Sequence, residues 1–268
     1  MANNYQDGFN DGLIVGMMQH PVFVGIGTTH NQRLHKFIVN VSAGTEITFY
    51  SLTIHSINGT ISWGDGTAEE YDSSNDYKHT YSSAGEKMII VDCNIVNMNH
   101  YGTWPLGELT QVQIGNGVTS MSSGMFYKCP NLVNVKLPDS LKKMENDGTP
   151  RYGPFSICNS ISTITIPPSL TSYSYAFKEC SKLETVNISD GCTIISDYAF
   201  SGSKNIKYVH IPVSVVNIGY VFIGLYSNLT IYYSGTVDQW NSISKDPSAF
   251  KNTIATVICT DGTITING

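Results

Sequence analysis

The stretch that decides the fold is Leu183-Glu-Thr-Val-Asn-Ile188, in which apolar residues occupy the first, fourth and sixth positions. The same spacing of apolar residues recurs from Leu109, Leu132, Ile161, Leu183 and Ile206. The starts are almost evenly spaced, with a single longer interval between Leu132 and Ile161. A period of about 20–29 residues with one short apolar strand in each unit is typical of stacked repeats. The sequence therefore predicts a solenoid, in which each repeat adds one strand.

A second landmark follows each predicted strand and moves with it. A phenylalanine recurs once in every repeat, at Phe126, Phe155, Phe177, Phe200 and Phe222. Its longest interval, from Phe126 to Phe155, falls in the same repeat as the longest interval between strands. Because two landmarks shift together, the longest repeat is explained by an insertion near Glu145–Tyr152. We expect this insertion to loop out from one face of the solenoid.

A third column of residues lies three positions after each phenylalanine. It is occupied by Cys129, Cys158, Cys180, Ser203 and Leu225. Three cysteines in one column could form a metal site or a disulfide. Serine and leucine at the same position favour the other interpretation, a stack of buried side chains whose role is packing. We expect the six cysteines of the chain to remain free thiols.

The repeat units resemble the BspA-type leucine-rich repeat. The resemblance rests on Leu183-Glu-Thr-Val-Asn-Ile188 with Ile195–Phe200, on Tyr175–Leu183, and on Ile-Pro after the strand at Ile166 and Ile211. Tyr232–Trp240 is similar to the terminal unit of such arrays, and the shortened Leu229–Tyr233 is expected to act as a cap. The resemblance implies a solenoid over residues 96–268 that presents a surface for binding.

Residues 34–95 show short alternating strands instead of repeats. The strands are expected at Phe37–Val41, Glu46–Tyr50, Thr60–Trp63 and Lys87–Val91. The Asp-Gly pair inside Ile61-Ser-Trp-Gly-Asp-Gly-Thr67 indicates a tight turn. Together with His79-Thr-Tyr-Ser-Ser-Ala-Gly85, this motif resembles the PKD-like β-sandwich, an immunoglobulin-like module. The resemblance implies that Trp63 anchors the core, while Asp65 is interpreted as a turn former in preference to a calcium ligand.

Residues 1–33 lie outside both modules. Glycines and bulky residues recur every four positions, at Gly8, Gly12 and Gly16 and at Tyr5, Phe9, Leu13 and Met17. On a helix these two rows would form a smooth groove beside a ridge, suited to packing against another chain. Three glycines also fit the opposite interpretation, that the segment is not helical. Because Leu13–Gly27 is apolar, we expect residues 1–33 to be an anchoring and oligomerisation segment.

Nothing in the sequence predicts catalysis. The seven histidines show no metal-binding spacing, and phosphate-loop and nucleophile-elbow motifs are not found. We therefore expect no enzyme activity, no catalytic or metal site and no cofactor. A net charge of −6 argues against nucleic acid as a partner. Gln19, His20 and Pro21 interrupt the most apolar window, which argues against membrane insertion.

The repeat strands predict a polar strip on their outward side, because side chains alternate across a strand. Its candidate ligand-facing residues are Gln111, Gln113, Asn134, Lys136, Thr163, Thr165, Thr185, Asn187, Tyr208 and His210. The strip suits a host-surface glycan or protein, although a merely solvated face would show the same pattern.

These features lead us to expect a structural and adhesion protein of a tailed phage particle, made in the host cytoplasm. Residues 1–33 would contact other virion proteins, and a homotrimer is the favoured assembly. Fibre, baseplate and head-decoration roles all fit. The expectation of a virion protein also rests on finding no secretory signal at the start of the sequence. The alternative is a BspA-like adhesin of the bacterial cell surface, and a third option is a carbohydrate-binding accessory domain of an enzyme.

Overall fold

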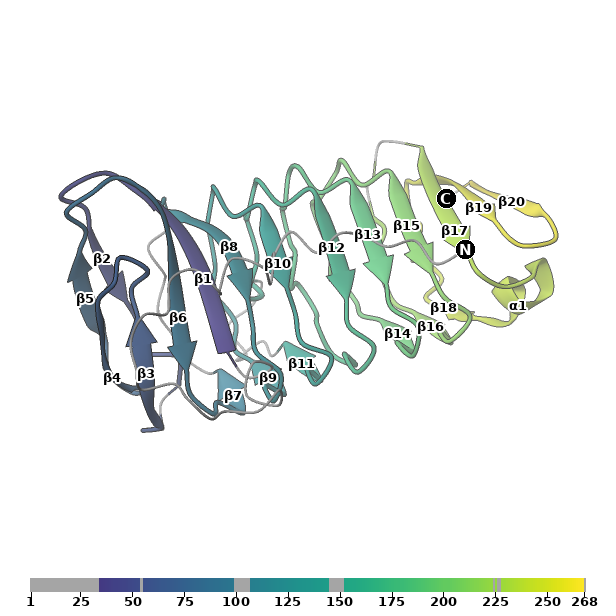
Figure 1. Cartoon of the computed structure of the whole chain (residues 1–268). Coiled ribbons are helices and arrows are strands. Elements are labelled where there is room, and N and C mark those ends of the chain that lie inside the picture. Colours follow the sequence, from purple (N-terminus) through teal and green to yellow (C-terminus); the bar gives the residue numbers. More distant parts are fainter. Residues whose placement is uncertain are drawn as a thin grey trace.

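The fold comes from a computed structural model that describes residues 34–53, 55–98, 107–144, 152–223, 225 and 228–267. This part of the chain is mainly β, as expected, and its one described helix is α1 (Val237–Ser242). The strands form a long solenoid that continues from a smaller sheet structure at the N-terminal side (Figure 1). The insertion at 145–151 and the N-terminal segment 1–33 lie outside the described residues.

Each described coil of the solenoid contributes one strand to a series of parallel strands, which is divided between two hydrogen-bonded sheets. The strand β8 pairs with β10, and the following strands are adjacent in the order β12, β13, β15, β17 and β19. The chain then turns back, so β20 pairs with β19 in the antiparallel direction. The bounds are β8 (Leu109–Gln113), β10 (Asn134–Lys136), β12 (Thr163–Ile166), β13 (Thr185–Ile188), β15 (Tyr208–Ile211), β17 (Leu229–Tyr233), β19 (Ile254–Ile258) and β20 (Thr263–Asn267).

A second series of very short strands runs along another side of the coils (Figure 1). They form two parallel ladders, joined across the gap by a bridge between Lys143 and Ser172. A coil therefore typically consists of a long strand, a short strand and the turns between them, and in the coil of β12 the short strand is reduced to the bridge at Ser172. The short strands are β7 (Asn97–Met98), β9 (Ser120–Met121), β11 (Lys143–Met144), β14 (Ile194–Ile195), β16 (Asn217–Ile218) and β18 (Ser244–Lys245).

The predicted phenylalanine column forms a continuous stack in the core. Neighbouring ring centroids lie 5.2 Å apart for Phe126 and Phe155, 5.4 Å for Phe155 and Phe177, and 5.9 Å for Phe177 and Phe200. All of these rings are buried. One coil cannot cover its own phenylalanine, so the ring is removed from water only when the next coil stacks on it.

The stack continues past Phe222 to Phe250, whose ring centroid lies 5.5 Å away. The expectation that Leu229–Tyr233 is a shortened cap is therefore wrong. It is the interior strand β17, and β19 pairs with it in the parallel direction. The additional coil escaped the repeat pattern because α1 widens the interval between Phe222 and Phe250, and because Ala255 is aligned with Leu229 of the preceding strand.

The side chains three residues after each phenylalanine also form hydrogen bonds in addition to packing in the core. Cys158 Sγ donates a hydrogen bond to the carbonyl of Phe126 at 3.1 Å, and Cys180 Sγ donates to Phe155 at 3.2 Å. Ser203 Oγ donates to the carbonyl of Phe177 at 2.8 Å. Thr253 Oγ1 occupies the same place in the added coil and donates to Phe222 at 2.7 Å. The position thus selects small side chains that also carry a donor, with the apolar Leu225 as the exception.

A residue with a left-handed backbone lies two positions after the ring in the turns that follow Phe126, Phe155, Phe177, Phe200 and Phe250. Its φ lies between 57° and 76°, at Lys128, Ile157, Glu179, Gly202 and Asn252. The amide N–H of Glu179 donates to the carbonyl of Ser201 in the next coil at 2.8 Å. The left-handed turn therefore directs a backbone donor along the solenoid, and this bond helps to hold residues other than glycine in an unfavourable conformation.

Before the repeats, two layers of strands pack together. One layer continues the repeat sheet, because β1 pairs in the antiparallel direction with both β8 and β6, giving the order β10-β8-β1-β6-β3-β4. The second layer is a pair of antiparallel strands, β2 with β5. The bounds are β1 (Leu34–Val41), β2 (Glu46–Phe49), β3 (Asn58–Ser62), β4 (Ala68–Asp72), β5 (Tyr77–Thr80) and β6 (Gly85–Asp92).

Aromatic contacts join the two layers and connect them to the solenoid. The Phe49 ring lies edge-on to Phe37 at 5.2 Å and to Trp63 at 6.2 Å between centroids. Trp63 is buried, as expected for a core anchor. Phe37 also lies 6.4 Å from Phe126, so it begins the phenylalanine stack of the repeats. One sheet and one core thus cross the predicted boundary between residues 34–95 and 96–268.

The donor column can be tested at Ser203. Its hydroxyl donates to the carbonyl of Phe177 and accepts from the amide of Cys180 at 2.9 Å. Replacement Ser203→Ala leaves both buried backbone groups without this partner, so we expect the free energy of unfolding to fall by about 3 kcal/mol. Urea denaturation measures this loss. Ser203→Cys retains a donor and should lose only about 1 kcal/mol; equal losses for the two variants would contradict a donor role.

Candidate binding surface on the repeat sheet

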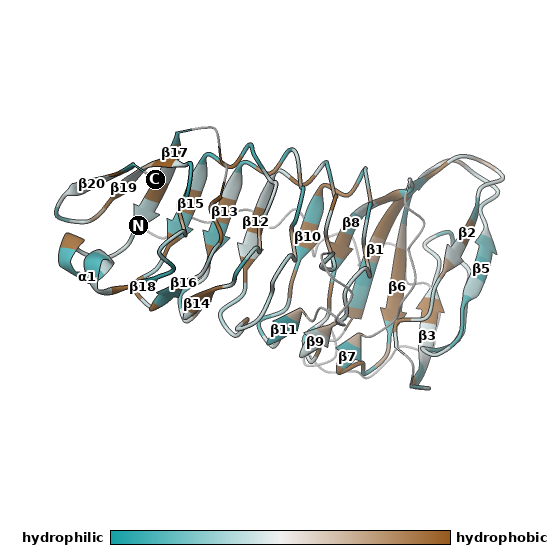
Figure 2. Cartoon of the chain, turned by 180° about the vertical axis from the view of Figure 1, so that it is seen from behind, coloured by the Kyte–Doolittle hydropathy of each residue, from teal (hydrophilic) through white to brown (hydrophobic). Residues whose placement is uncertain are grey.

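The strand register arranges the outward side chains of the repeat sheet in two rows. The residues between them along each strand, such as Val186 and Val209, are buried in the core. Figure 2 shows the resulting mixture of hydrophilic and hydrophobic residues along the strands. One row consists of Thr163, Thr185, Tyr208, Thr230 and Thr256, and the other of Thr165, Asn187, His210, Tyr232 and Ile258.

Six of the predicted ligand-facing residues lie in these rows: Thr163, Thr165, Thr185, Asn187, Tyr208 and His210. The structure adds Thr230 and Tyr232 from β17 and Thr256 and Ile258 from β19. These four were missed because Leu229–Tyr233 was interpreted as a cap. The alternation in Leu229-Thr-Ile-Tyr-Tyr233 was the available signal, since an apolar residue at every second position predicts an outward residue between.

The remaining predicted residues form a separate patch. Gln111 is aligned with Asn134, and Gln113 with Lys136. Asn134 Nδ2 donates to Gln111 Oε1 at 3.2 Å. The strands β10 and β12 belong to different hydrogen-bonded sheets, so the ladder of aligned residues is interrupted between this patch and the two rows.

The rows contain an exposed cluster of three rings on β15 and β17. His210 and Tyr232 are stacked, with centroids 4.8 Å apart and ring planes 13° apart. Tyr208 lies 6.4 Å from Tyr232. Tyr208 and Tyr232 are 43% and 38% exposed, which is unusual for large rings held in place by a rigid sheet. We name Tyr208, His210 and Tyr232 the aromatic cluster.

The histidine of the aromatic cluster is shifted toward its neutral form. Burial lowers the pKa of His210 below its usual value, because partial desolvation disfavours the imidazolium. The two rows contain no Lys, Arg, Asp or Glu. Their donors and acceptors are the hydroxyls of threonine and tyrosine, the amide of Asn187 and the neutral imidazole. The surface can therefore bind a neutral polar ligand with apolar faces.

A second aromatic series lies on the turns and was not recognised in the sequence. Tyr175 and Tyr198 are stacked with centroids 4.9 Å apart, and Tyr198 meets Tyr220 edge-on at 5.0 Å. Each tyrosine stands two residues before a phenylalanine of the core stack, which was the missed signal. Because Tyr175 and Tyr198 cover one another's faces, these rings mainly stabilise neighbouring turns.

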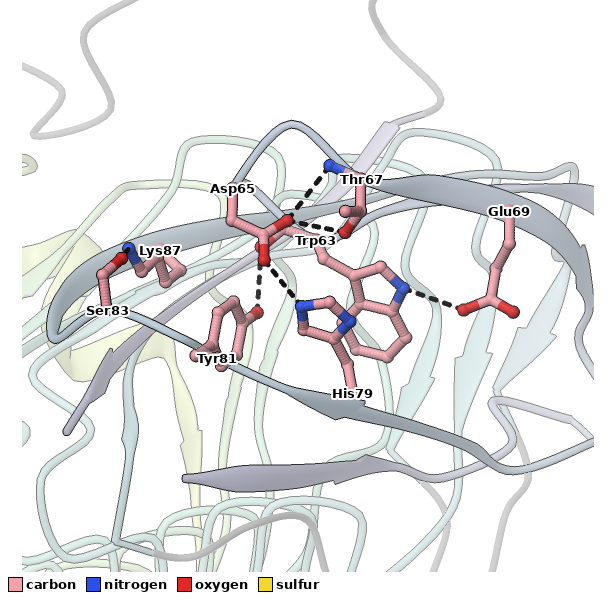
Figure 3. A network of polar contacts seen from close by, with 8 residues as sticks. All are labelled: Trp63, Asp65, Thr67, Glu69, His79, Tyr81, Ser83 and Lys87. Carbon is pink, nitrogen blue, oxygen red and sulfur yellow. Dashed lines mark hydrogen bonds and ion pairs between the residues drawn. The ribbon is translucent and has the colours of Figure 1, made fainter. Parts of the chain in front are cut away.

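The turn around Asp65 is held by a network of polar contacts (Figure 3). Asp65 Oδ1 accepts from the amide of Thr67 at 3.1 Å and from its hydroxyl at 2.6 Å. Asp65 Oδ2 lies 2.7 Å from His79 Nε2. Both carboxylate oxygens therefore contact donors within the protein. This arrangement suits the predicted role of Asp65 as a turn former.

The network also fixes the core tryptophan. The imidazole of His79 stacks on Trp63, with centroids 4.7 Å and ring planes 11° apart. Trp63 Nε1 donates to Glu69 at 2.9 Å, and the hydroxyl of Tyr81 donates to the Trp63 carbonyl at 2.9 Å. His79 thus connects the turn at Asp65 to the core, which is a structural role.

The titration of Asp65 follows from these contacts. Burial acts to raise the pKa of its carboxyl, but hydrogen bonds from Thr67 and His79 outweigh that effect and lower it below the usual value. The carboxylate therefore stabilises the fold above the pKa that this group has in the unfolded chain. This contribution is lost as the pH falls through the lower pKa of the folded state.

We expect Asp65→Asn to lower the free energy of unfolding by about 1–2 kcal/mol at pH 7, because charge-assisted hydrogen bonds become neutral ones. The difference from wild type should begin to shrink as the pH falls below about 3.8, the usual carboxyl pKa at which the unfolded chain is protonated, and should vanish once the pH falls below the lower pKa of Asp65 in the folded protein. Urea denaturation over this pH range measures it. The exposed Asp139 provides the control Asp139→Asn, and an equal loss there would contradict the specific role of Asp65.

The described residues contain no group of three or more His, Cys, Asp or Glu side chains arranged to hold a metal ion. The described cysteines are free. Burial raises the pKa of the Cys93 thiol to about 12 and also raises that of Cys180, so both are protonated thiols near neutral pH. Within the same residues, no helix has the length and apolar character needed to cross a membrane.

The predicted assembly contacts Tyr5, Gly8, Phe9, Gly12, Leu13, Gly16 and Met17 lie outside the described residues. Their role in anchoring or oligomerisation stays a prediction.

Part of the chain matches the model of a known repeat family. Residues 104–230 match the BspA type leucine rich repeat region, in six copies. This match and the solenoid confirm the repeat that was expected from the sequence. It does not extend over residues 34–95, for which the PKD-like resemblance stays a prediction.

Two solved structures are similar to this chain. A leucine rich cell surface protein from Faecalibacterium prausnitzii A2-165 is 23% identical, with a TM-score of 0.30, over 52% of this chain and 63% of that one. A leucine-rich repeat protein from Bacteroides ovatus ATCC 8483 is 20% identical, with a TM-score of 0.37, over 76% of this chain and 57% of that one. This chain thus spans less than two thirds of the length of either structure. No curated protein matches it.

Proposed function

We propose that this chain is a non-enzymatic adhesion protein whose repeat sheet binds a surface glycan. The observation that supports this proposal is the aromatic cluster, where Tyr208 and Tyr232 hold large exposed rings on the outward side of rigid strands. Exposed aromatic residues that gather in one place on a protein surface commonly mark a binding site. A repeat sheet also offers an extended face along which a long ligand can lie.

The chemistry of the rows favours a neutral glycan as the ligand. Tyrosine faces can pack against the apolar C–H side of a sugar ring, while hydroxyls and an amide exchange hydrogen bonds with its hydroxyls. An anionic ligand would find no cation in the two rows, since the lowered pKa of His210 leaves it neutral. A protein epitope is the alternative ligand, and it would be recognised by the same exposed rings.

The location of the protein belongs to the proposal as well. Residues 1–33, with the apolar stretch Leu13–Gly27, would anchor the chain in a phage particle as a fibre, baseplate or head-decoration protein. The alternative is display on the bacterial cell surface. The two similar structures do not decide between these locations, because their TM-scores are below 0.5.

Removal of the exposed rings tests the binding role. We expect the double variant Tyr208→Ala/Tyr232→Ala to weaken glycan binding by about tenfold or more, because each lost ring contact is worth about 0.5–1.5 kcal/mol. The measurement is binding to an array of neutral bacterial and host glycans, followed by titration of the best ligand. The melting temperature should change little, since neither tyrosine belongs to the buried core.

Tyr152→Ala provides a matched control, because Tyr152 is 41% exposed but lies outside the strands of the repeat sheet. It should leave the affinity unchanged. If the double variant binds as well as wild type, the rows are a solvated face and the proposal is wrong. If no glycan binds but a surface protein does, and that binding depends on the two tyrosines, the protein-epitope alternative replaces the glycan.

Mass spectrometry of purified phage particles and of shaved bacterial surfaces tests the location. The virion proposal predicts the chain in particles at a fixed ratio to the other structural proteins. Recovery only from bacterial surfaces would favour the alternative, and removal of residues 1–33 should abolish incorporation if they form the anchor.

A further inference from the structure

We propose that β20, the last strand of the repeat sheet, pairs edge to edge with β20 of a second copy of this chain. The strand β20 lies at the end of the sheet order, beside β19. Among the described strands, none pairs with its outer side. An edge strand of this kind presents backbone donors and acceptors that can bind another strand.

The hairpin geometry identifies which groups face outward. The amide of Cys259 donates to the carbonyl of Gly262 at 2.8 Å across the turn. Hydrogen-bonded and non-hydrogen-bonded pairs alternate along an antiparallel ladder. The pairs that contain Thr263, Thr265 and Asn267 are therefore of the non-hydrogen-bonded kind, and the backbone N–H and C=O groups of these three residues point to the open edge.

The strand is complementary to itself in one register. When two antiparallel copies are centred on Thr265, it faces Thr265 of the other copy, and Thr263 faces Asn267. Every outward-pointing backbone group of the strand is then paired. The same register places Ile264 beside Ile266 of the other copy. Both isoleucines are only partly buried against the core, so the pairing would extend the apolar underside of the sheet across the dimer.

The edge strand at the N-terminal end of the described chain carries charges that prevent pairing with another strand. The edge strand β4 carries Glu69, Glu70 and Asp72, and their like charges oppose pairing between copies. In contrast, Thr263-Ile-Thr-Ile-Asn267 contains no charge and no proline, and it consists largely of residues that favour strands. The neighbouring Ile258, aligned with Thr263, is also exposed. The two edges therefore differ in the features that normally prevent association.

We infer a second copy because β20 carries no charge that would repel an identical strand, and because its outward backbone groups and its partly buried isoleucines match those of an identical antiparallel strand about a two-fold axis through Thr265. The resulting dimer would carry two repeat sheets joined in one continuous sheet. This inference is independent of the proposed glycan binding, which concerns the outward side chains of the strands and not the edge.

Sedimentation velocity of the full chain over a wide concentration range tests the pairing. We expect a reversible association of two 29.3 kDa chains. Thr265→Pro removes an amide donor that no bond within the hairpin uses, so it should raise the dissociation constant by about tenfold or more. Thr265→Ala keeps the backbone donor and should leave the association close to wild type. Circular dichroism checks that both variants fold.

A charge exchange at the same position tests the register. Thr265→Lys alone and Thr265→Glu alone should each weaken association, because identical charges meet across the axis. An equimolar mixture of the two variants should recover it as a mixed dimer. Thr256→Lys places the same charge on the same face in the adjacent strand and should leave association unchanged.

Two results would overturn the proposal. One is a wild-type chain that stays monomeric at every concentration. The other is an oligomer whose dissociation constant is unaffected by Thr265→Pro and by both charged variants, as an assembly held only by residues 1–33 would behave. Charged variants that weaken association without recovery on mixing would overturn the two-fold register.

Discussion

Contact between one coil and the next is the constraint on which the rest of this structure depends. A coil has a strand, a short second strand and turns, and it encloses too little volume to bury its own phenylalanine. The rings are buried by the neighbouring coils, and contacts between them run from Phe37 in β1 to Phe250 in the last coil. The buried donors at Cys158, Cys180 and Ser203 follow from the same contact, because they pair carbonyls of the preceding coil.

The sequence predicted those parts of the fold that have a periodic pattern of apolar residues. Apolar residues at fixed spacing identified β8, β12, β13 and β15, because burial on one side of a strand is a local property of its sequence. The coil that contains Phe250 lacks this pattern, since α1 lengthens the interval to the ring and Ala255 replaces leucine. The pairing of β1 with β8 was not predictable either, because it joins segments of opposite direction that are far apart in the sequence.

The candidate binding surface, like the fold, was predicted from the sequence only in part. Alternation along each strand was sufficient to identify Thr163, Asn187 and Tyr208 as outward residues. The stacking of His210 on Tyr232 depends on the register between β15 and β17, which a single sequence does not specify. Asp65 was correctly interpreted as part of a turn, but its partner His79 lies on another strand and could be assigned only from the structure.

The continuous sheet through β1 and β8 has a consequence for how such a protein can change during evolution. Repeats within the solenoid present equivalent surfaces to their neighbours, so a coil can be duplicated or lost by recombination with little disturbance beyond the new junction. The first coil is different, because its strand is matched to β1 in direction and register and its phenylalanine to Phe37. Variation in length is therefore expected among the later coils, while the first coil and the strands before it are inherited together as one unit.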